Sequence, residues 1–161
     1  MENIERDVLK NLDVMQIQQY QQNRHPILFI DFVLEALPGK YAKGYKNFSF
    51  NEWFFPAHFA DEPNVPGFIQ VEMLTQMFLM TFLTMPENKG KKTSFVNISN
   101  AQFKKKIVPG DRVDIESTLL FYSRGVAKGK SVGTINGEFA CSIELTVAIP
   151  DVLNQFKPQQ K

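Results

Sequence analysis

A strongly apolar run, GFIQVEMLTQMFLMTFLTM, occupies residues 67–85 and limits the architectures open to this chain. It contains no proline, and no glycine after Gly67, and it is too long for one strand; we therefore predict a helix of about 28 Å. Pro66 at its start and Asn64 just before it are typical of a helix N-terminus. Apolar residues occur on all sides, which predicts that the helix is buried over most of its surface.

Three polar side chains make this helix a poor membrane span. Gln70, Glu72 and Gln76 interrupt the first half of the run. Its length barely reaches the ~20 residues that a span requires. We therefore expect a helix that is covered by protein, and no membrane partner.

The segments around the helix indicate antiparallel strands. Residues 27–36 and 40–50 could form a hairpin around a Leu-Pro-Gly-Lys turn, and a strand with a basic end is expected at 94–107. Asn136-Gly137 is a strong hairpin signal between two alternating runs. Two later segments place apolar residues on one face of a strand: Val113, Ile115, Leu119 and Phe121, and then Phe139, Cys141, Ile143, Leu145, Val147 and Ile149. Together they predict an α+β fold, with an antiparallel β-sheet wrapped around a long central helix.

The length of 161 residues is typical of one domain, which we place at residues 25–153. Residues 1–24 are predicted to be a polar, solvated lead-in segment. The first part of this segment carries a stripe of apolar residues at helical spacing: Ile4, Val8, Leu12 and Met15. Residues 154–161 form a C-terminal tail that we expect to be frayed.

Composition excludes several classes of function. The formal net charge is +1, so the totals indicate no nucleic-acid partner. A single cysteine, Cys141, rules out an internal disulfide, and the N-terminus lacks the apolar region of a signal peptide; both suit a cytoplasmic protein. Two histidines and one cysteine are too few for a typical zinc site, and no phosphate-binding glycine loop or G-x-S-x-G elbow is present. We expect neither a metal nor a cofactor.

Glu72 is the unusual residue of the apolar helix. An ionised carboxylate among apolar residues is costly unless it is paired or faces a cavity, and burial favours the protonated form that a general acid needs. Gln76 lies four residues later on the same helical face, where it could hold the carboxyl group by a hydrogen bond. The alternative is a partly exposed helix position or a purely structural hydrogen bond.

His58 lies in the proline-broken loop before the helix, with enough chain between them for the loop to fold back. A lone loop histidine is usually structural or exposed, but histidine is also the usual base near neutral pH. A histidine base and a carboxyl acid together would suit removal of a proton beside a carbonyl group, coupled to loss of a hydroxyl group.

Two further features could serve such a reaction. Gly67 begins the helix, where free N–H groups and the positive end of the dipole could stabilise an enolate-like oxygen; the alternative is a glycine kept for a tight helix entry. The basic run Lys104, Lys105 and Lys106 is either a solvated strand end or a docking patch for an acidic partner.

The segment HFADEPNVPGFIQVEMLTQ resembles the active-site segment of the hot-dog-fold β-hydroxyacyl-(acyl carrier protein) dehydratases, the FabZ-like group. That family's pattern runs roughly G-H-F-P-x-x-P-x-x-P-G-x-x-x-x-E-x-x-x-Q. The flanks HPILFIDFVLEALPGK and FVNISNAQFKKKIVPGD also look alike, so the likeness covers most of residues 25–149. The matching positions are His58, Phe59, Pro63, Pro66, Gly67, Glu72 and Gln76.

The resemblance implies a hot-dog fold and a homodimer with two active sites at its interface, each taking its histidine from one subunit and its glutamate from the other. A trimer of dimers is also compatible with it. His58 would remove the C2 proton, and Glu72 would protonate or position the C3 hydroxyl group. The Gly67 N–H would hold the thioester carbonyl, Gln76 would orient Glu72, and Phe59 would help to position the substrate.

By the same resemblance, the acyl chain would lie in an apolar tunnel along the helix, and the lysines 104–106 would meet the acidic carrier protein. The product would be a trans-2-enoyl thioester, made for fatty-acid synthesis or for related polyketide or polyene synthesis. Isomerising relatives typically carry aspartate at the acid position, so Glu72 favours dehydration without isomerisation.

The chain departs from the family pattern around His58. Ala57 replaces the usual glycine, Ala60 replaces a proline, and Asp61-Glu62 stands where Gly-Arg is common. The more acidic loop leaves open which substrate and which carrier protein the enzyme would use. Two alternatives to the dehydratase also remain. One is a hot-dog acyl thioesterase, which would not need His58, and the other is a non-catalytic hot-dog protein that binds acyl chains or a partner subunit.

Overall fold

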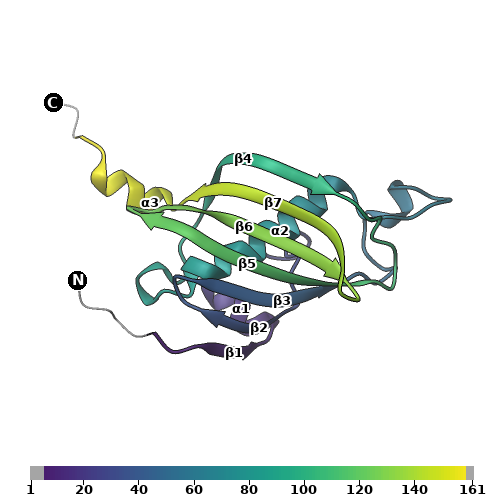
Figure 1. The fold of residues 1–161 in the computed structure, drawn as a ribbon, viewed down its shortest axis with the longest axis horizontal. Helices are drawn as coiled ribbons and strands as arrows, with labels where there is room; N and C mark the ends of the chain where they lie inside the picture. Colours follow the sequence, from purple (N-terminus) through teal and green to yellow (C-terminus); the bar gives the residue numbers. More distant parts are fainter. Residues whose placement is uncertain (1–5, 159–161) are drawn as a thin grey trace.

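The structure is a computed structural model that describes residues 6–158. Seven strands form one antiparallel sheet in the order β1-β2-β3-β5-β6-β7-β4 (Figure 1). The sheet consists of β1 (Leu9–Leu12), β2 (Phe32–Leu37), β3 (Tyr41–Asn47), β4 (Ser94–Phe103), β5 (Arg112–Ser123), β6 (Val126–Ile135) and β7 (Glu138–Ala148).

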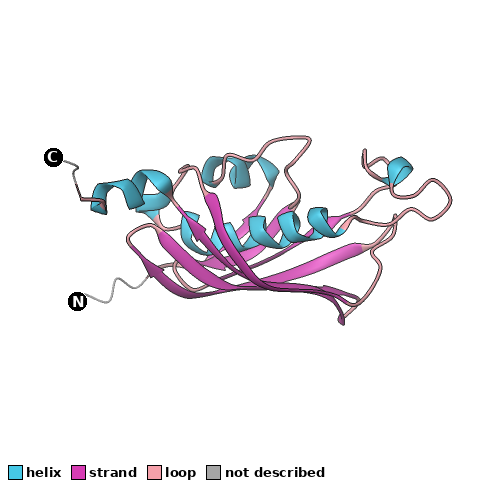
Figure 2. Ribbon diagram, turned by 90° about the horizontal axis from the view of Figure 1, so that it is seen from above, coloured by secondary structure: helices cyan, strands magenta, loops and turns pink. Residues whose placement is uncertain are grey.

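One long helix, α2 (Gly67–Leu83), lies along the concave side of the curved sheet (Figure 2). It contacts β2, β3, β5, β6 and β7. The shorter elements are α1 (Val14–Tyr20), α3 (Pro150–Leu153) and the single 3₁₀ turns η1 (Phe55–Ala57), η2 (Pro86–Asn88) and η3 (Asn154–Phe156). The predicted α+β architecture, a sheet wrapped around a central helix, is confirmed.

Helix α2 forms the middle of the core, as its sequence predicts. Every residue from 73 to 83 is buried, whereas Glu72 is only partly buried and Phe68 is exposed. Gly129 of β6 allows the helix to lie this close to the sheet, because a Cβ atom there would stand 2.4 Å from the Phe78 ring. Within residues 6–158, no helix is long and apolar enough to cross a membrane.

The strand pattern is confirmed with two local exceptions. Asn136 and Gly137 have φ angles of 49° and 78° and form the turn between β6 and β7. In β7, alternate residues from Cys141 to Val147 are buried, but Phe139 is 38% exposed because the β6–β7 register shifts beside it. A similar shift in the β5–β6 pairing leaves Phe121 49% exposed.

The helical stripe predicted at the N-terminus is wrong. Residues 9–12 form β1, which pairs with β2, and α1 begins only at Val14 after a capping box between Asp13 and Gln16. The capping side chain starts the helix at this point. Within the stripe, Leu12 is buried and Met15 is 66% exposed, while Ile4 lies outside the described residues.

The lead-in segment is also not simply solvated. Ile17 of α1 is fully buried, and the Gln21 side chain, equally buried, donates a hydrogen bond to the Gln76 backbone carbonyl at 3.4 Å. Because β1 belongs to the sheet and α1 packs into the core, the folded unit extends to the N-terminal side of the predicted boundary at residue 25.

Two other boundaries differ from the prediction. The strand expected from Ile27 begins at Phe32, because the backbone groups of Ile27 and Phe29 bond to the Gln76 side chain of α2 instead of to a neighbouring strand. Strand β4 ends at Phe103 instead of residue 107. The N–H groups of Lys104 and Lys105 both donate to the Ala140 carbonyl, so the regular pairing of β4 with β7 ends there.

Candidate active site

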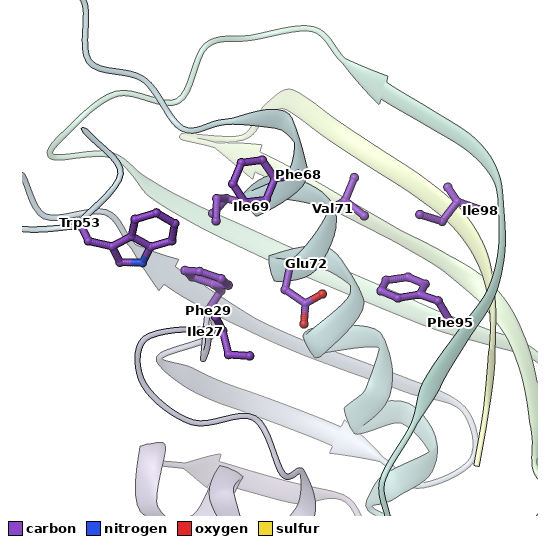
Figure 3. Close-up of a pocket in the computed structure, with 9 residues that line it drawn as sticks. All are labelled: Ile27, Phe29, Trp53, Phe68, Ile69, Val71, Glu72, Phe95 and Ile98. Carbon is purple, nitrogen blue, oxygen red and sulfur yellow. The ribbon is translucent and has the colours of Figure 1, made fainter. Parts of the chain in front are cut away.

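An apolar cavity of about 640 Å³ opens beside the first turns of α2 (Figure 3). Its walls come from the segment before β2, the loop before α2, α2 itself and β4. Glu72 is the one charged side chain of this lining, and it extends between Phe29 and Phe95. The lining residues are Ile27, Phe29, Trp53, Phe68, Ile69, Val71, Glu72, Phe95 and Ile98.

Gln76 fixes the position of Glu72. Its amide nitrogen donates to Glu72 Oε1 at 2.8 Å and to the Ile27 carbonyl at 2.6 Å, and its amide oxygen accepts from the Phe29 N–H at 2.6 Å. Gln76 is fully buried, so these bonds satisfy both its amide N–H groups and its oxygen. The same side chain therefore orients the carboxyl group and ties the cavity wall at residues 27–29 to α2.

His58 lies at the base of a narrow loop. Its Nδ1 lies 3.0 Å from the Asn64 carbonyl oxygen, and the Asn64 N–H donates back to the His58 carbonyl at 2.9 Å. A carbonyl oxygen can only accept, so Nδ1 carries a proton, and in the neutral imidazole Nε2 is the nitrogen with the lone pair. Phe59 stacks on the imidazole with 4.3 Å between the ring centroids. This is the tautomer that a base acting through Nε2 requires.

One chain brings some of the predicted residues together and leaves others apart. Glu72 and Gln76 meet, but His58 does not belong to the cavity that Glu72 lines. Gly67 is the first residue of α2, so its N–H has no partner four residues back within the helix. A Cβ atom at Gly67 would stand 3.6 Å from the Phe103 ring, an ordinary contact.

The basic run at the end of β4 is partly neutralised within the chain. Lys105 pairs with Glu138 at 2.6 Å, and Lys106 pairs with Glu62, one of the acidic residues of the His58 loop. The hydrogen bond from Lys106, together with its charge, lowers the pKa of the Glu62 carboxyl group. Lys104 is exposed.

The sequence did not reveal the part of the site that comes from distant segments. The sequence predicts Ile27 and Phe29 in one strand, Trp53 in a loop, and Phe95 and Ile98 in another strand. All five line the cavity. Strand β4 carries apolar residues on both faces although every residue of this edge strand is exposed. This apolar content is the signal that could have marked β4 as part of the site.

Cys141 is not a candidate nucleophile. It is fully buried in β7, and burial raises the pKa of its thiol to about 12. Because the thiolate is the reactive form, this side chain acts as a small core residue. Among residues 6–158, no three histidine, cysteine, aspartate or glutamate side chains are grouped so that they could hold a metal ion.

Comparisons with known proteins agree on one family. A FabA-like domain model matches residues 22–144. The chain is 42% identical over 140 residues to the 3-hydroxyacyl-(acyl-carrier-protein) dehydratase FabZ of Geobacillus thermodenitrificans, covering 87% of this chain and 97% of that protein. It is 40% identical over 138 residues to the FabZ of Bacillus subtilis, covering 86% and 98%.

Solved structures show the same fold at low sequence identity. The dehydratase heterocomplex ApeI:P of Xenorhabdus doucetiae superposes with a TM-score of 0.71 at 16% identity, over 86% of this chain and 95% of that one. The PaaI protein of Escherichia coli gives 0.57 at 5% identity, over 72% and 80%. The predicted hot-dog fold is therefore confirmed. From the family match and the identity across nearly the whole length of its relatives, the chain belongs to the FabA-like family and, within it, to the group of the FabZ dehydratases.

Proposed function

We propose that the protein converts 3-hydroxyacyl thioesters carried on acyl carrier protein into trans-2-enoyl thioesters, in fatty-acid synthesis or a related pathway. The observation that carries this proposal is the Glu72–Gln76 pair in the wall of an apolar cavity, in a chain of the FabZ group. Apolar walls can bind an acyl chain, and a carboxyl group held in a fixed position can act as an acid at one carbon of that chain.

The reaction needs one base and one acid. His58 Nε2 takes the proton from C2, and the electrons of that C–H bond form the C2=C3 double bond. The C3–O bond breaks as Glu72 gives its proton to the hydroxyl group, which leaves as water. The Gly67 N–H and the positive end of α2 stabilise the charge on the thioester oxygen while the C2 proton is being removed. No step calls for a cofactor.

A homodimer would complete this site. His58 and Glu72 do not share a cavity within one chain, and β4 is an edge strand whose exposed residues include Phe95, Val96 and Ile98. An exposed apolar edge strand favours pairing with a second copy. In this arrangement His58 of one subunit faces Glu72 of the other, and further association into a trimer of dimers leaves the pairing unchanged.

The proposal is tested by product analysis of the wild-type protein with 3-hydroxyacyl thioesters of acyl carrier protein over a range of chain lengths. Mass spectrometry should show loss of one water from an acyl group that stays on the carrier. Release of a free 3-hydroxy acid would instead select the thioesterase alternative. An unchanged substrate at every chain length would select the acyl-binding alternative.

We further propose that the lysines 104–106 contribute to docking of the acidic carrier protein. Replacing Lys104 and Lys106 by alanine is expected to raise KM for carrier-bound substrate about threefold to tenfold, as expected for two exposed charges, and to flatten its dependence on salt. Lys105 stays, because it is partly buried and pairs with Glu138. Steady-state kinetics across a salt series gives both quantities.

The matched control replaces Lys128 and Lys130, two exposed lysines of β6, and should leave KM unchanged. A thioester of a small thiol, which offers no acidic protein surface, should give the same KM with every variant. An unchanged KM of the Lys104 and Lys106 variant for carrier-bound substrate would refute the docking role.

A further inference from the structure

Glu72 also lines a second, smaller cavity of about 170 Å³. Four of its other lining residues carry hydroxyl or amide groups: Asn23, Thr75, Thr93 and Ser94. They come from the N-terminal segment, from α2 and from the entry to β4. Glu72 thus borders both an apolar cavity and a polar cavity.

The polar cavity can hold water, and the apolar cavity cannot hold it well. A volume of about 170 Å³ accommodates roughly five water molecules, and a bound water needs two to four polar partners. The apolar cavity offers few such partners besides Glu72 itself. Phe95 borders both cavities, so together with Glu72 it forms the boundary between them.

The polar side chains keep hydrogen-bonding capacity to spare. Thr75 donates to the Val71 carbonyl at 2.8 Å, which leaves its oxygen free to accept. The Asn23 amide nitrogen donates to the Gln21 side chain at 3.0 Å, which leaves its amide oxygen free to accept. Asn23 and Thr93 are partly exposed, so the cavity reaches the surface through residues that lie outside β4.

The proposed reaction requires a route by which water can pass between Glu72 and the solvent. Each turnover releases one water at Glu72 and leaves Glu72 ionised and His58 protonated. The enoyl chain still fills the apolar cavity at that moment, so the water has no favourable way out beside it. Glu72 must then regain a proton from solvent before the next turnover.

We propose that the polar cavity lined by Asn23, Thr75, Thr93 and Ser94 is the water site of this enzyme, through which the departing water leaves and Glu72 is reprotonated. The ligand is water, and in the reverse reaction the attacking water enters by the same path. The inference rests on the proposed dehydration. It assigns a positioning role to side chains that touch water and do not touch the acyl chain.

The test compares two isotope exchanges in the full-length protein. Wild type and Thr93→Val are incubated with a 3-hydroxyacyl carrier-protein thioester in water enriched in both deuterium and ¹⁸O, and the remaining substrate is analysed by mass spectrometry. Deuterium at C2 reports exchange through His58, and ¹⁸O at C3 reports exchange of the leaving water. In Thr93→Val, the ratio of ¹⁸O to deuterium exchange should fall about fivefold, the factor that corresponds to one lost hydrogen bond.

The ratio separates this role from a general loss of structure, because a damaged fold slows both exchanges alike. Ser94→Leu, at the first residue of β4, fills the cavity and should lower the same ratio, so the test stands if Thr93→Val does not fold. Thr134→Val on β6, away from Glu72, is the matched control. An unchanged ratio in Thr93→Val and Ser94→Leu overturns the water route. Absence of enoyl product together with absence of both exchanges in wild type would instead overturn the proposed dehydration.

Discussion

Replacing His58 by alanine or Glu72 by glutamine is expected to lower kcat for dehydration by about 10²–10⁴, the usual contribution of one positioned acid or base. His58→Ala removes the nitrogen that takes the C2 proton. Glu72→Gln keeps the volume of the side chain and an oxygen that can accept the bond from Gln76, but it removes the acidic proton. Formation of enoyl thioester at saturating substrate measures both effects.

The chain provides a matched control for the histidine. His25 is the other histidine of the sequence and is exposed, so His25→Ala should keep kcat within about twofold of wild type. Circular dichroism and thermal unfolding of all three variants would show whether each one is folded. Near-full activity of folded His58→Ala would refute the role of His58 as the base.

The parts of the fold that follow from local periodicity could be predicted. The apolar run at 67–85 predicts a buried helix, which is observed over residues 67–83, and the Asn136-Gly137 turn joins two strands as expected. These features depend on residues close in sequence, where the chain's own geometry decides the outcome. The strand alternation also held wherever the register is regular, and failed at Phe121 and Phe139, beside shifts in pairing.

The parts that depend on long-range hydrogen bonds could not be predicted. Residues 27–31 look like a strand, but the Gln76 side chain takes the backbone groups of Ile27 and Phe29. The N-terminal stripe looked helical, but β2 offers residues 9–12 a pairing partner. In both cases a partner distant in sequence overrides the local preference.

The candidate site also has one part that the sequence predicts and another part that it does not. The four-residue spacing of Glu72 and Gln76 predicted their hydrogen bond, because one helical turn joins them. Local sequence patterns could not predict that Asn23 and Thr93 line the same polar cavity as Glu72, because three separate segments form this cavity. His58 is a different case, because its proposed partner belongs to a second subunit.

Combining the two inactive variants in one dimer is expected to restore activity. If each site takes His58 from one subunit and Glu72 from the other, a mixed dimer of His58→Ala and Glu72→Gln keeps one intact site of two. It should therefore show about half of the wild-type kcat per dimer. Co-expression with two different affinity tags and sequential purification isolates this dimer.

The decisive control carries the same two substitutions on one subunit. A mixed dimer of wild type with the double variant His58→Ala and Glu72→Gln then has no intact site if the residues meet across the interface, because each site lacks either its base or its acid. If both residues acted within one subunit, this dimer would keep half of the activity and the mixture of single variants would stay inactive. The two dimers have identical composition, so a difference in kcat between them can come only from which subunit supplies each residue. Activity in the single-variant dimer alone would support a site shared between subunits, and activity in the double-variant dimer alone would refute it.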